Sequence, residues 1–323
     1  MDWRRLKAAL LEQGSVRLAG EDADAYISRS AAGPSAGSAG SVFFAVGNRR
    51  VRLGIDPASP VTLVHDGGGV ATLALGGERV WGRLEQAALH CPRQAYITVT
   101  GACIFGCRYC PVPSLAGRRK SVGEIARLVE SVKGRIDAVS ITSGVASTVE
   151  EEEEYVLEVV RALRQFDLPI GVAIYPTPDS PRRLHDLGVV EVKFNLETAT
   201  PALFAEICPG LDRDAVWEAL RQSVALFGRG RVFSNVIVGL GETDEEIGQC
   251  IDELAWIGVI PVIRPLSPAA DLADLPRPSA ERLLGIFDLH KQALQRAGLH
   301  PEEALTMCSA CTACDLVPGR DSP

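Results

Sequence analysis

The pattern of apolar and polar positions changes near residue 90 and becomes regular beyond it. From residue 95, near-continuous apolar runs alternate with amphipathic segments, which predicts six strands that are each followed by a helix. The predicted strands are 95–101, 138–144, 170–176, 190–198, 231–241 and 259–268. The predicted helices are 121–134, 151–166, 180–188, 214–228, 244–258 and 280–298.

These six units predict an α/β fold with a parallel sheet, because strands that are apolar on both faces need helices to cover them. Right-handed crossovers would curl six such units into a barrel or a partial (β/α)6 barrel. A doubly wound open sheet is the alternative, although no Rossmann-type phosphate loop follows the first predicted strand.

Residues 1–90 have a different pattern. The first 14 residues predict a short surface helix, and the β-prone runs at 42–55 and 61–77 are separated by glycine-rich turns. We therefore predict a small antiparallel β unit, with a loosely structured lid as the alternative. The Gly/Ser/Ala-rich stretch 27–41 is predicted to be irregular and mobile in either case.

Three predicted helices begin with a capping box, in which a hydroxyl and a carboxylate bind the first free amides of the helix reciprocally. The pairs are Ser121 with Glu124, Ser147 with Glu150, and Thr243 with Glu246. The acidic run 150–154 fits the same interpretation, since a helix N-terminus favours negative charge.

Composition narrows the classes of function. A net charge of −8 over 323 residues does not indicate a nucleic-acid partner. No apolar run reaches the ~18 residues of a membrane span and the N-terminus lacks a secretory signal, so we expect a cytoplasmic protein. Six of the nine cysteines form two tight groups, which in a reducing compartment favours metal binding or catalysis.

The first group, in "TGACIFGCRYCPVP", places Cys103, Cys107 and Cys110 directly after the first predicted strand. In barrels the loops that follow strands form the active-site face. Three thiolates can hold three irons of a [4Fe–4S] cube, and the fourth iron is left open for a substrate or cofactor. The alternative is a structural zinc site, which would need a fourth ligand.

This motif, "CIFGCRYC", resembles the signature of the radical S-adenosylmethionine (SAM) superfamily, including the aromatic residue Tyr109. The resemblance implies that the open iron chelates SAM, and that reductive cleavage of SAM yields a 5′-deoxyadenosyl radical that abstracts hydrogen. It covers about residues 95–268.

Three later strand ends resemble other SAM-binding segments of the superfamily. In "ITSG", Ser143 and Gly144 stand where the family binds the methionyl amino group. "VKFNLET" resembles the ribose-binding segment of biotin and lipoyl synthases, which implies ribose contacts by Asn195 and Glu197; two residues apart, they would share one side of a strand.

The third segment is "NVIVGLGET", in which Gly239 and Gly241 would let the backbone approach the adenine and Ile237 would pack on it. Here Asn235 departs from the glycine that is frequent in the family, and Glu242 has an alternative role as a helix-start acid.

One departure concerns the SAM carboxylate. "EICPGLDRD" resembles a lipoyl synthase segment, but Cys208 occupies the position of an arginine. Arg264 or Arg213 would have to bind the carboxylate instead, and the sequence does not decide between them.

The second group, "MCSACTACD", contains Cys308, Cys311 and Cys314 and predicts an auxiliary [4Fe–4S] cluster, with a zinc knuckle as the alternative. The candidate fourth ligands are Cys91, Cys208, Ser309 and His300. Cys250 lies in a predicted amphipathic helix and is interpreted as a core residue.

We accordingly predict a β-rich region at 1–90, a radical SAM barrel at 91–298 and an auxiliary-cluster segment at 299–323. The resemblance to biotin and lipoyl synthases implies sulfur insertion into an unactivated C–H bond. It also implies two [4Fe–4S] clusters and SAM as cofactors, a ferredoxin or flavodoxin as electron donor, an acylated carrier protein or peptide as substrate, and a second radical SAM protein as partner.

Two other functions stay open. One is a radical methyltransferase or peptide-modifying enzyme whose auxiliary cluster anchors substrate or carries electrons. The other is a non-catalytic iron–sulfur redox protein, which would not bind SAM.

Overall fold

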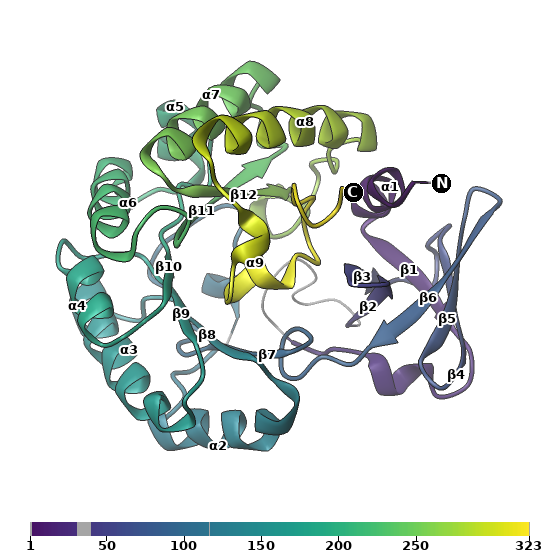
Figure 1. The fold of residues 1–323 in the computed structure, drawn as a ribbon, viewed down its shortest axis with the longest axis horizontal. Coiled ribbons are helices and arrows are strands. Elements are labelled where there is room, and N and C mark those ends of the chain that lie inside the picture. The colour runs from purple at the N-terminus through teal and green to yellow at the C-terminus, as the bar shows by residue number, and fades with distance from the viewer. Residues whose placement is uncertain (1, 31–39, 116, 323) are drawn as a thin grey trace.

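Two β structures lie side by side in the computed structural model, which describes residues 2–30, 40–115 and 117–322 (Figure 1). One is a closed six-stranded barrel built from the N-terminal residues, and the other is a curved parallel sheet with helices around its outer face. Most of the predicted irregular stretch 27–41 lies outside the described residues, at 31–39.

The N-terminal barrel follows the helix α1 (Trp3–Gln13). Its strands are β1 (Ser15–Ala19), β2 (Ser41–Val46), β3 (Arg49–Ile55), β4 (Thr62–Gly67), β5 (Val70–Leu75) and β6 (Glu78–Glu85). The prediction of a β unit holds here, but the expectation of purely antiparallel pairing is wrong. β1 pairs in parallel with both β3 and β4, which closes the barrel and leaves no exposed edge.

The parallel sheet has the order β12-β11-β10-β9-β8-β7, so successive strands are neighbours and the sheet curls as a partial barrel. Its strands are β7 (Gln94–Thr98), β8 (Ala138–Thr142), β9 (Ile170–Ala173), β10 (Glu191–Lys193), β11 (Val232–Val238) and β12 (Ile260–Pro265). The predicted mixed α/β fold is confirmed.

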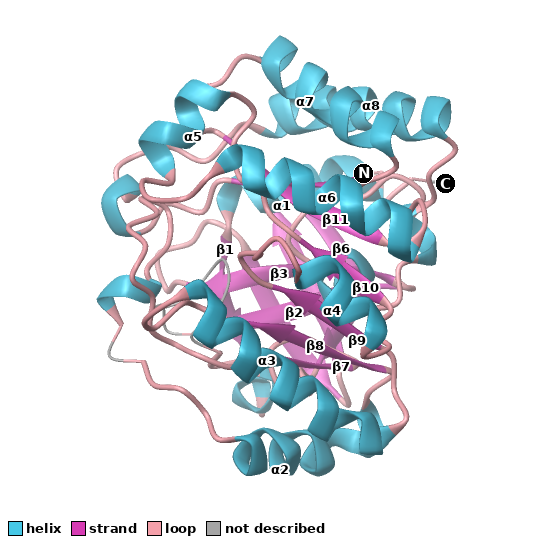
Figure 2. Cartoon of the chain, turned by 90° about the vertical axis from the view of Figure 1, so that its left-hand side faces the viewer, coloured by secondary structure: helices cyan, strands magenta, loops and turns pink. Residues whose placement is uncertain are grey.

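Helices cover the outer face of this sheet, as Figure 2 shows. They are α2 (Val122–Val132), α3 (Val149–Leu163), α4 (Ser180–Asp186), α5 (Pro201–Ile207), α6 (Arg213–Phe227), α7 (Asp244–Ile257) and α8 (Ala280–Ala297). Short 3₁₀ turns occur at Ala23–Tyr26, Val112–Ser114, Lys133–Arg135, Arg164–Phe166, Ala270–Leu272 and Pro301–Glu303. Among the described residues, no helix is long and apolar enough to span a membrane.

One of the three predicted capping boxes forms completely, that of Thr243 and Glu246. Ser121 caps α2 as predicted, and the Glu124 carboxylate also pairs with Arg118. The box predicted at Ser147 is wrong, because α3 begins one residue later, after Thr148.

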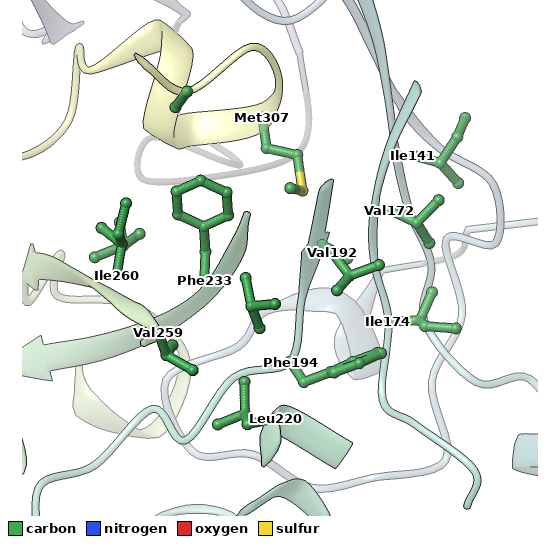
Figure 3. Packing of buried hydrophobic residues seen from close by; sticks show 14 of the residues in the cluster. Ile141, Val172, Ile174, Val192, Phe194, Leu220, Phe233, Val259, Ile260 and Met307 are labelled. Atoms are coloured by element: carbon green, nitrogen blue, oxygen red, sulfur yellow. The ribbon is translucent and has the colours of Figure 1, made fainter. Parts of the chain in front are cut away.

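The last helix, α9 (Met307–Cys311), lies inside the curve of the sheet, where Met307 packs with Phe233 and Ile260 in the core (Figure 3). Glu191 at the start of β10 holds the segment before α9, since its carboxylate accepts from the amides of residues 305 and 306 at 2.9 and 2.8 Å. Gly171 is needed opposite, because a Cβ there would lie 2.0 Å from Thr306 Oγ1. The C-terminal segment therefore fills the end of the barrel at which the strands begin.

A buried ion pair joins the two ends of the chain. Lys7 of α1 donates to Asp321 at 2.7 Å and to the Thr312 carbonyl at 2.6 Å, and Trp3 donates to Asp321 at 2.8 Å. From the barrel, the Arg52 amide donates to the Ala313 carbonyl at 2.8 Å. The cysteine-bearing C-terminal segment is thus attached to both β structures.

Candidate active site

The first cysteine group lies in the loop between β7 and α2, at the end of the sheet where the strands finish. Cys103, Cys107 and Cys110 are all partly exposed. The loop is held compact by a hydrogen bond from the Cys110 amide to the Cys107 carbonyl at 2.9 Å and by another from Ile104 to Val145 at 2.8 Å. Three accessible thiols on one loop suit three irons of one cube.

A fourth cysteine, Cys208, contacts this loop. It ends α5, is almost fully buried, and its thiol donates to the Cys107 sulfur, which lowers the pKa of Cys107. The amide of Arg108 also donates to the Ile207 carbonyl at 2.9 Å. Cys208 therefore belongs to the first site, and its candidacy as a ligand of the second site is wrong.

Glu197 and Asn195 lie together near the first cysteine loop, although β10 ends at Lys193 and the predicted continuous strand 190–198 is wrong. Glu197 has a left-handed backbone, with φ of 61°, that is held by amide–carbonyl bonds with β11. Its buried carboxylate accepts from Tyr109 and Asn195, while burial raises the pKa of Glu197. An amide and a carboxylate at this place suit a pair of hydroxyl groups.

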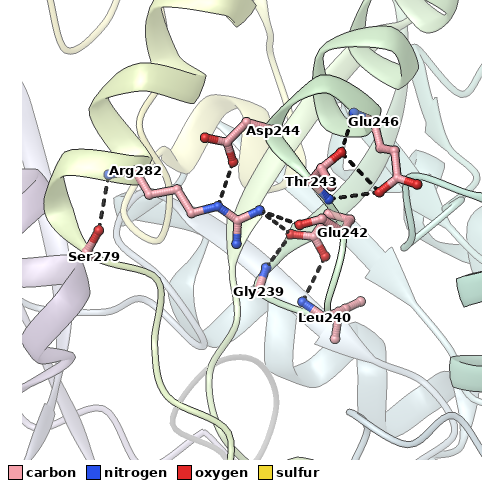
Figure 4. Close-up of polar contacts among 8 residues, drawn as sticks. All are labelled: Gly239, Leu240, Glu242, Thr243, Asp244, Glu246, Ser279 and Arg282. Carbon is pink, nitrogen blue, oxygen red and sulfur yellow. Dashed lines mark hydrogen bonds and ion pairs between the residues drawn. The ribbon is translucent and has the colours of Figure 1, made fainter.

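The glycine loop after β11 is organised by Glu242 (Figure 4). This carboxylate accepts from the amides of Gly239 and Leu240 at 2.7 and 2.8 Å and from Arg282 at 2.9 Å. The φ values of Gly239 and Gly241, 109° and 113°, require glycine. Ile237, the predicted adenine contact, is buried on β11 and packs in the same cluster as Cys208.

The positions of Ser143 and Gly144, which follow β8, are set by contacts with neighbouring residues. The Ser143 hydroxyl donates to Glu152 at 2.6 Å and accepts from the Thr100 amide at 3.0 Å. Gly144 is required because a Cβ there would lie 2.3 Å from the Ala102 carbonyl oxygen. The predicted contact of this pair with the methionyl amino group stays a prediction.

The second cysteine group lines one small pocket where the two β structures meet. The lining residues of this pocket are Phe43, Arg52, His90, Cys91, Tyr96, Arg264, Cys308, Cys311, Ala313 and Cys314. Of the four candidate fourth ligands, Cys91 lines this pocket. Cys208, Ser309 and His300 are absent from the lining, and His300 is exposed and bound to Glu302.

Cys91 lies among the three predicted ligands. Its thiol donates to Cys311, which lowers the pKa of Cys311 to about 7. Among the described residues, no three His, Cys, Asp or Glu side chains converge on one point as the ligands of a single metal ion do. A cube binds each thiolate to a different iron and needs no such convergence.

A continuous series of contacts connects the two cysteine groups through the barrel interior. Lys193 of β10 lies 3.8 Å from the Cys308 sulfur and 3.4 Å from the Asn235 side-chain oxygen. The Asn235 amide in turn donates to Asn195 at 3.2 Å, and Asn195 binds Glu197. Lys193, Asn195 and Glu197 lie on one short segment. That segment therefore runs from the second cysteine group to the first.

Arg264 and Arg213 are in different places. Arg264 lines the pocket of the second cysteine group, where its charge acts on Cys308, Cys314 and also on Glu197. Arg213 lies over the Trp217 ring of α6, 5.7 Å from its centroid. Of the two arginines predicted as carboxylate ligands, Arg264 is the one that faces the interior.

Sequence reasoning missed Lys193, Tyr96 and Arg52 as parts of the second site. The sequence contains a signal for Lys193, because Lys193 precedes Asn195 by two residues and positions two apart on a strand share a face. The sequence contains no such signal for Arg52, because Arg52 belongs to the separate N-terminal barrel.

The first site thus combines a partial parallel barrel with a strand-end loop that presents three thiols. Residues 97–254 match the sequence model of the Radical SAM superfamily, so the chain contains a radical SAM domain. This superfamily uses a [4Fe–4S] cluster and SAM, and the three loop thiols with the neighbouring Asn195 and Glu197 fit both groups. Membership of the biotin and lipoyl synthase group stays a prediction.

Solved structures agree with this fold. The chain is 19% identical to the [FeFe]-hydrogenase maturase HydG of Carboxydothermus hydrogenoformans, with a TM-score of 0.52 over 62% of this chain and 51% of that one. It is 13% identical to Streptococcus suis SuiB bound to SAM, with a TM-score of 0.53 over 64% of this chain and 48% of that one.

At these identities the similarity shows the fold alone, and the chain spans about half the length of the two structures. No curated protein matches the chain.

Proposed function

We propose that this chain is a radical SAM enzyme that cleaves an unactivated C–H bond of a substrate held inside the barrel, between two [4Fe–4S] clusters. The observation that carries the proposal is the contact series from Cys308 through Lys193, Asn235 and Asn195 to Glu197. This series connects the two cysteine groups, which supports a substrate site between them.

The residues have separate tasks in this proposal. Cys103, Cys107 and Cys110 hold the first cluster, while Asn195 and Glu197 bind the ribose of SAM. When bound, the cluster and SAM supply one electron and a carbon-centred radical that removes hydrogen. Arg264 and Lys193 present positive charge to an acidic group of SAM or of the substrate.

Two uses of the second cluster fit this placement. Sulfur insertion of the lipoyl or biotin type is supported by the segments "NLET" and "VGLGE" and by a thiol group that faces the substrate space. The other use is substrate anchoring, which needs an open iron, or electron transfer. Electron transfer is supported by the fourth buried thiol, Cys91, because a cluster with more thiolate ligands is harder to dismantle. An electron donor, a carrier protein or peptide, and a second radical SAM partner are proposed with either use.

The radical step is tested by Cys107→Ala in anaerobically reconstituted protein given SAM and a reductant. Loss of one of the three thiolates should abolish formation of 5′-deoxyadenosine, measured by chromatography. Cys250→Ala is the matched control, since Cys250 is a buried thiol of α7 outside both groups. A Cys107→Ala protein that forms the product at the unmodified rate would contradict the proposal, as would an unmodified protein that binds no SAM.

The use of the second cluster is tested by reconstitution with heavy sulfide. Sulfur insertion predicts heavy sulfur in the product, about one product set per chain, and release of iron in step with turnover. Cys311→Ala should then still cleave SAM but form no thiolated product. Many turnovers with the heavy sulfide retained on the protein would exclude sulfur insertion and support the other use.

A further inference from the structure

We infer that Cys91 is the fourth ligand of the second cluster, which is then held by Cys91, Cys308, Cys311 and Cys314. The inference rests on the proposed function in one respect, namely that a second cluster is present. Nothing in the C-terminal motif itself points to Cys91, which precedes the radical SAM domain and lies far from that motif in the sequence.

Position is the first argument. Cys91 lies in the connection between β6 and β7, where the Ala88 amide donates to its carbonyl at 3.0 Å. Its side chain is 1% exposed, lines the same pocket as the three C-terminal cysteines, and donates to Cys311. It also packs with Cys311 and Phe43 in one small buried cluster.

Charge is the second argument. An oxidised [4Fe–4S] cube with four thiolates carries a net charge of about −2, and a buried charge of that size needs nearby cations. Arg52 and Arg264 line the pocket, Lys193 lies 3.8 Å from Cys308, and Arg50 acts on both Cys311 and Cys91. The charge of Arg264 acts on Cys308 and Cys314, and also on the buried Asp315.

The neighbouring histidine fixes the position of Arg52. The Nε2 atom of His90 lies 3.2 Å from Arg52 Nη1, and both residues line the pocket beside Cys91.

Four thiolates have a consequence for function. Every iron of the cube then has a protein ligand, and no iron is open to a substrate or easily lost. A second cluster held in this way is suited to electron transfer and is poorly suited to being consumed as a source of sulfur.

The test uses full-length protein in which Cys103, Cys107 and Cys110 are all replaced by alanine, so that only the second site can take up iron. Anaerobic reconstitution should give about four irons per chain. Mild oxidation should produce little of the [3Fe–4S] signal in electron paramagnetic resonance. Adding Cys91→Ala should produce a strong [3Fe–4S] signal and the loss of about one iron per cluster, while adding Cys250→Ala should change neither.

If the Cys91→Ala protein takes up no iron, the Cys91→Ser protein tests the assignment. A serine oxygen on the fourth iron should retain the cluster but shift its reduction potential to more negative values. An unchanged potential in Cys91→Ser, or an equally strong [3Fe–4S] signal with Cys91 intact, would overturn the assignment. Failure of the proposed function looks different: the background protein would then take up no iron even with Cys91 present.

Discussion

At the scale of single residues, Glu197 combines a strained backbone with a buried acid. A left-handed conformation at a non-glycine residue costs of the order of 1 kcal/mol and persists where the surroundings enforce it. Here the enforcement comes from the amide–carbonyl pairs of Glu197 with Asn235 and Ile237. The conformation directs the carboxylate to Tyr109 of the cysteine loop, where SAM would lie.

Glu197→Ala should therefore weaken SAM binding by about ten- to a hundred-fold, because loss of a charged hydrogen-bond partner costs roughly 1.5–3 kcal/mol. Titration calorimetry on the reconstituted protein measures the affinity, and iron analysis should show that both clusters remain. Glu206→Ala is the control, since Glu206 is an exposed carboxylate that pairs with Arg108 of the same loop. Equal affinities in the two variants would place the ribose elsewhere.

At the scale of elements, α1 and the C-terminal segment form one structural unit with the second site. Lys7 is fully buried and binds both Asp321 and the carbonyl of Thr312, which lies between Cys311 and Cys314. A displaced α1 would therefore displace the proposed cluster ligands.

Lys7→Met should lower the free energy of unfolding by about 3–5 kcal/mol, because Asp321 would be left as a buried unpaired charge. The variant should also hold less iron at the second site. Denaturant unfolding and iron analysis measure the two effects. Arg4→Met is the control on the same helix, where an exposed pair with Asp288 should contribute only about 0–1 kcal/mol. If both variants behave alike, α1 does not position the second site.

The sequence predicts correctly those features that depend on residues close to one another along the chain. The six strand–helix units and the Cys103 loop follow from patterns within a few residues. The meeting of Asn195 with Glu197 does not follow from the predicted alternation along a strand, because β10 ends at Lys193 and Glu197 is left-handed. The parallel pairing of β1, the contact of Cys208 with Cys107 and the proximity of Cys91 to Cys311 depend on which distant segments pack together. Periodicity and spacing carry no information on such packing.

At the scale of the whole molecule, the second site lies where three parts of the chain meet. The N-terminal barrel contributes Arg52, the link before β7 contributes Cys91, and the C-terminal segment contributes its three cysteines. A ligand that binds the folded arrangement stabilises it, so a cluster here should hold the parts together.

Removal of iron by a chelator should therefore lower the melting temperature and speed hydrogen exchange in residues 307–321. Exchange in α6, on the outer face of the sheet, should change less. The measurement uses the variant in which Cys103, Cys107 and Cys110 are replaced by alanine, so that only iron at the second site is removed. Exchange that stays unchanged in 307–321 after full loss of iron would show that the segment is held by the Lys7 and Glu191 contacts alone.

The meeting of these three parts also sets an order of maturation. The thiols of the first loop lie within eight residues, from Cys103 to Cys110, and can gather as soon as that loop is made. The second site needs Lys7, Cys91 and residues 308–321 together, and contacts between such distant segments form late because closing long loops costs entropy. A cluster proposed at the second site would therefore be inserted only after these distant segments have packed together, and later than a cluster at the first loop.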